Sequence, residues 1–249
     1  MGITKMTGLS AKKLENFMVI ALVLTGILVT FNQIQLSAIS SSFDSLTGSA
    51  SKSTIFFGLG SKKSTDLSKV DVTEITSTAM ALASLFPELD TIQNDEDAIS
   101  IMVPTGTPEY SEALGGITFD DPVTSMEYLA KWYDTINSEV KQNDPEIWQR
   151  YLGLAAAPRG ISCEFCCGVG PAGITADGKS KCGCKHNPAI LALTMGLMKE
   201  TDYSDAEILR EAMKWKTMWF PRNMVGLAME VAGTDPSQLK ELPGMVGGC

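Results

Sequence analysis

The sequence predicts a mostly α-helical protein with an N-terminal transmembrane helix, a Ser/Gly-rich stalk and a helical bundle domain that contains a Cys-rich loop. Three observations predict it: an uncharged apolar run near the N-terminus, capping residues placed directly before prolines, and five cysteines gathered in one short segment. We therefore divide the chain into a cytoplasmic tail, a transmembrane anchor, a flexible stalk and a folded domain, with predicted boundaries at 1–13, 14–36, 37–69 and 70–249.

The predicted anchor contains the apolar run 17–31, which carries no charged residue. As a helix this run spans roughly 22 Å, whereas a bilayer core needs about 30 Å, but the uncharged stretch continues to Leu36 and then reaches that length. A buried core helix is one alternative. A cleaved signal peptide is another, because Leu36-Ser37-Ala38 has the small residues of a cleavage site. We favour the anchor because polar residues separate that site from the apolar run.

The distribution of lysines predicts the orientation of this anchor. Lys5, Lys12 and Lys13 precede the apolar run, and no Lys or Arg follows it until Lys52. Positive residues stay on the cytoplasmic side of a membrane, so we expect a single-pass protein of the cell membrane whose C-terminal domain is extracytoplasmic. The lipid bilayer, bound through 14–36, is then the predicted partner. Residues 37–69 are rich in Ser, Thr and Gly, a composition that favours a flexible stalk.

The first part of the domain has helical spacing with one ambiguous segment. Apolar residues recur at three- and four-residue steps from Val72 to Phe86, and Pro87 follows them. The segment 99–103 is compatible with a short strand or with the end of a helix. We expect one small strand pair near 99–119 as the only departure from an all-helical domain.

Helix starts are clearer in the second half of the chain. An Asp or Asn directly before a proline is typical of a helix N-terminus, because its side chain accepts from exposed amides and proline suits the first helical position. Ser204 and Glu207 form the S-x-x-E pattern of a capping box. The segment after Asn187 is apolar on nearly all sides, which predicts a central helix. The four Asx-Pro pairs are Asp121-Pro122, Asp144-Pro145, Asn187-Pro188 and Asp235-Pro236.

Charge and residue content exclude some classes of function. The net charge is -9 and the pI is about 4.7, so the chain lacks the basic face that nucleic-acid binding requires. No nucleic acid is expected as a partner. The chain has one histidine and no Ser-His-Asp arrangement, so the sequence gives no indication of an enzyme.

The cysteine-rich segment follows the pattern C-x2-C-C, a loop of fourteen residues, and then C-x-C-x-H. Each short pair of thiolates can chelate one side of a metal, and a glycine-rich loop lets the two halves meet. A histidine beside a cysteine pair is also a common ligand of zinc. The candidate metal ligands are Cys163, Cys166, Cys167, Cys182, Cys184 and His186.

We expect Cys163, Cys166, Cys182 and Cys184 to bind the metal, with Cys167 or His186 as a substitute or additional ligand. The identity of the metal stays open between three classes. Zinc suits four thiolates or three thiolates with a histidine, an iron–sulfur cluster suits four thiolates, and copper(I) suits crowded sulfur.

Disulfides are the main alternative to a metal, because they are usual outside the cytoplasm. The six cysteines are an even number and allow 15 connectivities. However, the adjacent Cys166 and Cys167 cannot easily bond each other, and Cys182 and Cys184 are also a poor pair. Cys163 and Cys166 form a C-x-x-C that could exchange disulfides, but the surrounding sequence lacks a thioredoxin-like βαβ pattern.

Two resemblances rest on these residues. The segments 161–168 and 182–187, together with the later 215–221, resemble a group of uncharacterised archaeal membrane-anchored Cys-rich proteins. The order C-x2-C then C-x-C before a helix is similar to the helical [2Fe-2S] domain of molybdenum hydroxylases. The first resemblance implies a domain boundary and no activity, and the second implies an iron–sulfur cluster at the start of a helix.

Two functional hypotheses follow. The first is a membrane-anchored extracytoplasmic metal-binding protein with a structural or electron-carrying role. The second is a disulfide-stapled surface protein for interaction or assembly, without a metal.

Overall fold

The computed structural model describes residues 66–239 and 242–248. The anchor predicted at 14–36 and the stalk up to residue 65 lie outside these residues, as does Cys249. Within the described ranges, no helix has the length and apolar character needed to cross a bilayer. The last residues of the predicted stalk form a short 3-10 helix, η1 (Leu67–Lys69), and Leu67 packs against the core.

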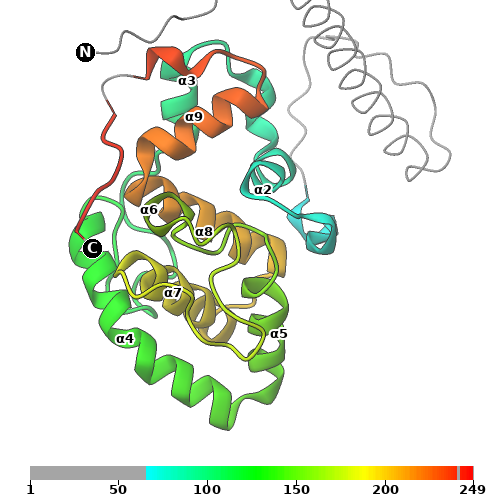
Figure 1. Cartoon of the computed structure of the whole chain (residues 1–249), viewed down its shortest axis with the longest axis vertical. Coiled ribbons are helices and arrows are strands. Elements are labelled where there is room, and N and C mark those ends of the chain that lie inside the picture. The colour runs from blue at the N-terminus through cyan, green and yellow to red at the C-terminus, as the bar shows by residue number, and fades with distance from the viewer. Residues whose placement is uncertain (1–65, 240–241, 249) are drawn as a thin grey trace, which may run out of the picture. The chain divides into compact units, whose positions relative to one another are not determined.

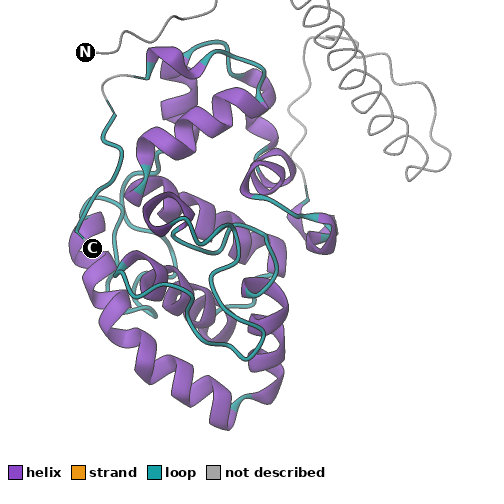
Figure 2. Ribbon diagram, in the orientation of Figure 1, coloured by secondary structure: helices purple, strands orange, loops and turns teal. Residues whose placement is uncertain are grey.

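The described domain is helical, as predicted, and Figure 2 shows helices joined by loops. Residues 66–239 contain no strand, only two isolated bridges between Ile161 and Ala172 and between Ile174 and Ser180. The α-helices in chain order are α2 (Thr78–Leu85), α3 (Asp95–Met102), α4 (Pro122–Asn143), α5 (Pro145–Ala155), α6 (Glu164–Cys167), α7 (His186–Glu200), α8 (Asp205–Trp219) and α9 (Pro221–Val231). Shorter 3-10 turns are η2 (Val72–Glu74), η3 (Pro87–Thr91) and η4 (Pro236–Gln238).

The strand pair expected near 99–119 was wrong. Ile99 and Ile101 lie in the second half of α3, and turns follow to the start of α4. The side chain of Asn94 accepts a hydrogen bond from the Asp97 backbone and caps α3, and three acidic residues in the first turn favour the positive end of the helix. These signals outweigh the strand preference of the short β-branched run.

Most predicted helix starts were confirmed, but not every expected cap. Asp121 caps α4 by accepting from the Thr124 backbone, and Ser204 forms the full capping box with Glu207. Asp235 caps η4, a single turn. α5 begins at Pro145 as expected, but the Asp144 side chain makes no capping hydrogen bond.

Helix α7 is the centre of the domain. Twelve of its residues, from His186 to Met198, are buried, in agreement with its predicted all-round apolar character. Helices α4, α5 and α8 pack around it, and α4 runs alongside it in Figure 1. On the other side of α8 lie α2 and α9, and α3 packs against α9. The first residue of this central helix belongs to the cysteine-rich region, so a helix that is buried along most of its length carries one side of the candidate site.

We predict that Leu193→Ala lowers the free energy of unfolding by about 2–5 kcal/mol, because it leaves a cavity in the centre of the core. Leu193 is fully buried in α7. The matched control is Val123→Ala on the exposed first turn of α4. Urea denaturation of the purified protein followed by circular dichroism measures both. Equal effects of the two substitutions would contradict the central place of α7.

Candidate metal centre

Two segments supply the candidate ligands, and both border short or irregular structure. One is the helix α6 with the residue before it, and the other is the loop that leads into α7. Gly168 ends α6 in the left-handed conformation, with φ 65°, so the chain turns sharply directly after Cys167. Cys163 precedes α6, Cys166 and Cys167 form its end, Cys182 and Cys184 lie in the loop, and His186 begins α7.

The loop between the cysteine segments folds back across the residues before α6. The Gly160 backbone donates to Pro171 O, and Ile161 bridges Ala172. A Cβ atom on Gly173 would lie 2.2 Å from Ile161 O, so only glycine allows these two backbone segments to approach so closely. The Lys181 backbone then donates to Gly173 O. Residues 160–162 and 180–182 are thereby held to the same part of the loop.

Asn187 connects these segments to α7. Its Oδ1 accepts from the Cys163 backbone at 3.2 Å, and its Nδ2 donates to Gly173 O at 2.9 Å and to Ser180 Oγ at 2.7 Å. The prediction that Asn187 caps a helix was therefore wrong, because α7 already begins at His186. The buried amide finds three partners in the folded loop instead, as a buried polar group requires.

Four of the predicted ligands converge. The sulfur atoms of Cys163, Cys167, Cys182 and Cys184 all lie within 4.8 Å of one another. Cys184 Sγ lies 3.3 Å from both Cys163 Sγ and Cys182 Sγ. Tetrahedral coordination with metal–sulfur bonds of about 2.3 Å separates the sulfurs by about 3.8 Å. The arrangement is thus geometrically compatible with one metal ion held by four thiolates.

The membership of this group differs from the expected set in one residue. Cys167 takes the place that we predicted for Cys166. Cys163 and Cys167 are four residues apart around α6, and side chains at this spacing lie on the same face of a helix. Cys166 belongs instead to a second group with Cys184 and His186, whose ligand atoms also lie within 4.8 Å of one another.

No disulfide joins the described cysteines to one another. Cys184 Sγ lies 3.3 Å from Cys163 Sγ and from Cys182 Sγ, and the Cys166 and Cys167 sulfurs are 3.7 Å apart, whereas a disulfide bond is about 2.05 Å long. Disulfide stapling of the cysteine-rich loop is therefore not the arrangement that this structure favours.

The close sulfurs influence one another's protonation. Hydrogen bonding with Cys163, helped by the Asn187 backbone N–H, lowers the pKa of Cys184 to about 2, although burial acts in the opposite direction. The same contact with Cys184, together with burial, raises the pKa of Cys163. A hydrogen bond with Cys182 raises the pKa of Cys167 to about 11. Negative charge is therefore favoured at Cys184 and disfavoured at Cys163 and Cys167.

The two ring nitrogens of His186 have different surroundings. Nε2 lies 2.9 Å from Val246 O, and a carbonyl oxygen can only accept, so Nε2 carries the proton. Nδ1 then keeps its lone pair and, among the described residues, has no hydrogen-bond partner although it is buried. A histidine that donates one nitrogen to a carbonyl and presents the other is the usual form of a metal ligand.

A buried ion pair fixes α6 to α8. Lys216 is fully buried, and its Nζ lies 2.5 Å from Glu164 Oε1 and 2.9 Å from Gly160 O. Thr78 on α2 donates to the same carboxylate. Burial lowers the pKa of Lys216, while Glu164 acts against this shift. Sequence reasoning did not find Lys216, because nothing in its local pattern separates it from an exposed helical lysine.

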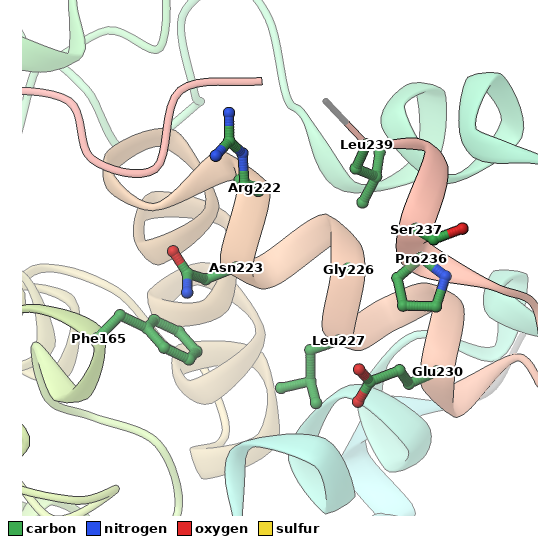
Figure 3. Close-up of a pocket in the computed structure, with 9 residues that line it drawn as sticks. All are labelled: Phe165, Arg222, Asn223, Gly226, Leu227, Glu230, Pro236, Ser237 and Leu239. Carbon is green, nitrogen blue, oxygen red and sulfur yellow. The ribbon is translucent and has the colours of Figure 1, made fainter. Parts of the chain in front are cut away.

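A cleft of about 560 Å³ lies beside α6. Figure 3 shows Phe165 on one side and residues of α9 and η4 on the other. Phe165 directly precedes Cys166, so the cleft adjoins the cysteine-bearing helix. The lining residues are Phe165, Arg222, Asn223, Gly226, Leu227, Glu230, Pro236, Ser237 and Leu239.

Comparison with known proteins gives no match: no family model, curated protein or solved structure is similar to this chain. The resemblances to archaeal Cys-rich proteins and to the helical [2Fe-2S] domain therefore stay predictions.

We predict that Asn187→Ala lowers the free energy of unfolding by at least about 2 kcal/mol, because each buried group left without a partner costs about 1–3 kcal/mol. Asn143→Ala, at the exposed end of α4, is the matched control. Urea denaturation measures stability, and the reaction rate of the thiols with a disulfide reagent measures opening of the loop. An Asn187 variant as stable and as slow to react as the control would contradict the role of this amide.

We predict that Lys216→Met lowers the free energy of unfolding by about 3–5 kcal/mol, because it leaves the Glu164 carboxylate partly buried without its cation. The double variant Lys216→Met/Glu164→Gln removes both charges and recovers part of this loss. The matched control is Lys179→Met, whose ion pair with Asp177 is exposed to solvent and contributes little to stability. Thermal unfolding compares the variants, and a double variant no better than Lys216→Met would exclude the ion pair as the cause.

Proposed function

We propose that the chain is a membrane-anchored metal-binding protein whose helical domain holds a metal ion at Cys163, Cys167, Cys182 and Cys184, outside the cytoplasm. The convergence of these four sulfur atoms within 4.8 Å carries the proposal. The anchor and the extracytoplasmic location rest on the apolar run 17–31 and the lysines before it.

A single tetrahedral ion fits this site better than a multi-iron cluster. In a [4Fe-4S] cluster each thiolate binds a different iron, and in a [2Fe-2S] cluster two thiolates bind each iron, so the sulfurs spread further apart than around one ion. Four thiolates in tetrahedral geometry are typical of zinc or of a single iron. Zinc is the first candidate, because all four positions around the ion are filled by the protein, as in structural zinc sites.

A structural role is supported by the way in which the ligands are distributed. They lie on the two sides of a fourteen-residue loop that has only two isolated bridges of regular structure. An ion bound to both sides joins α6 to the start of α7 and closes this loop. The free energy of metal binding then contributes to the folding of the region.

An electron carrier with a single iron is the second candidate. Cys167 is exposed and Cys182 is partly exposed, so one edge of the site faces solvent. An exposed thiolate edge favours contact with a redox partner. Visible absorbance separates this candidate from zinc, because zinc has no redox chemistry and a filled d shell.

We predict that the full-length protein, purified in detergent under reducing conditions, contains bound metal by elemental analysis. Zinc gives a colourless protein, and iron gives visible absorbance. Cys182→Ser removes a ligand and weakens metal binding by more than about 100-fold, which exceeds the usual effect of changing a residue behind the ligands. Cys249→Ser, the same change in the cysteine furthest along the chain, is the control. A protein that contains no metal, and in which mass spectrometry before reduction finds all cysteines paired in disulfides, would contradict the proposal.

A further inference from the structure

We propose that Cys166, Cys184 and His186 hold a second metal ion beside the first, so that the domain carries a two-metal centre in which the Cys184 sulfur bridges both ions. This inference rests on the proposed tetrathiolate site and adds a second position to it. The ligand atoms of the three residues lie within 4.8 Å of one another, which is close enough for one ion to bind all three.

Cys184 belongs to both groups of ligands. A thiolate sulfur that binds one metal ion keeps lone pairs that can bind a second one. Cys184 Sγ also lies 3.3 Å from Cys163 Sγ and from Cys182 Sγ, so it is in contact with two members of the four-cysteine group. The sulfurs of Cys166 and Cys167, which belong to different groups, are 3.7 Å apart. The two candidate ion positions are therefore adjacent.

His186 gives an independent reason for a ligand at the second position. Its ring is buried at 1% exposure, and its Nδ1 has no hydrogen-bond partner among the described residues. A buried lone pair without a partner is costly, and a metal ion at the Cys166 side of Cys184 would supply the missing partner. The four-cysteine group makes no use of this nitrogen.

The orientation of the His186 ring is fixed by contacts on its Nε2 side and on its face. Val246 O accepts the Nε2 proton, and the Val246 backbone in turn donates to Trp219 O at 2.8 Å. The ring also packs against Phe220, with a centroid distance of 4.8 Å. Nδ1 is therefore kept unprotonated and directed to one place, as in metal sites whose histidines are positioned by carbonyl groups.

The second position is chemically different from the first. Three protein ligands leave one of the four positions of a tetrahedral coordination shell open, whereas four thiolates fill all positions around the first ion. Cys166 is only partly buried, so this place borders the solvent on the side of that residue. The structure therefore assigns to the second ion a site of the open kind, which takes an exogenous ligand such as water.

Titration of the metal-free full-length protein with Co²⁺ under reducing and oxygen-free conditions tests this inference. We expect two Co²⁺ ions per chain by native mass spectrometry, each with the absorption bands of tetrahedral thiolate coordination. The electron paramagnetic resonance signal that grows with the first equivalent should fall when the second is added, because a shared sulfur couples the two ions magnetically.

Two variants remove the second position alone. His186→Gln keeps a side-chain N–H for Val246 O but lacks a ring nitrogen for the metal, and Cys166→Ser removes the thiolate. Each is expected to bind one Co²⁺ ion instead of two, with a circular dichroism spectrum like that of the original protein. Cys167→Ser is the matched control for Cys166→Ser, because it alters the four-cysteine group and should weaken the first ion.

The outcomes separate the inference from the proposed function. One ion per chain, unaffected by His186→Gln and Cys166→Ser, overturns the two-metal centre and leaves the tetrathiolate site intact. Two ions without magnetic coupling overturn the bridging role of Cys184 and with it the inference. No bound Co²⁺ at all overturns the proposed function itself.

Discussion

The side-chain amide of Asn187 is the interaction on which the candidate metal centre depends. One amide group accepts from the backbone of the first cysteine and donates to two points of the loop that carries the others. Since Asn187 belongs to the central buried helix, the whole cysteine-rich region is positioned by the core of the domain. Regular structure in that region is limited to α6 and two bridges, so these hydrogen bonds replace the ladder that a sheet would provide.

Local sequence signals predicted most of the helical framework. Asp121 and Ser204 act through neighbouring residues alone, so their caps could be identified from the sequence, and the apolar α7 revealed its central place. The failures have a different cause. Asn187 stands before a proline, as capping residues do, but its partners lie up to 24 residues away in the sequence. The segment 99–103 was ambiguous because β-branched residues near the end of a short helix have the composition of a strand.

The candidate site was predictable in composition but not in its internal arrangement. The cysteine spacing identified all six residues whose ligand atoms converge, whereas their division into two groups required the path of α6. Cys166 and Cys167 are neighbours in the sequence, and only the rotation between successive helical residues directs them to different groups. The ion pair of Lys216 with Glu164, which fixes that rotation, joins residues 52 positions apart and has no local signal.

The hydrogen bond between His186 and Val246 also has a consequence for the biosynthesis of the protein. The two residues are separated by 60 positions, so the imidazole leaves the ribosome long before the carbonyl that selects its tautomer. The form of the imidazole at the start of α7 is therefore decided only when a segment made 60 positions later has docked against it.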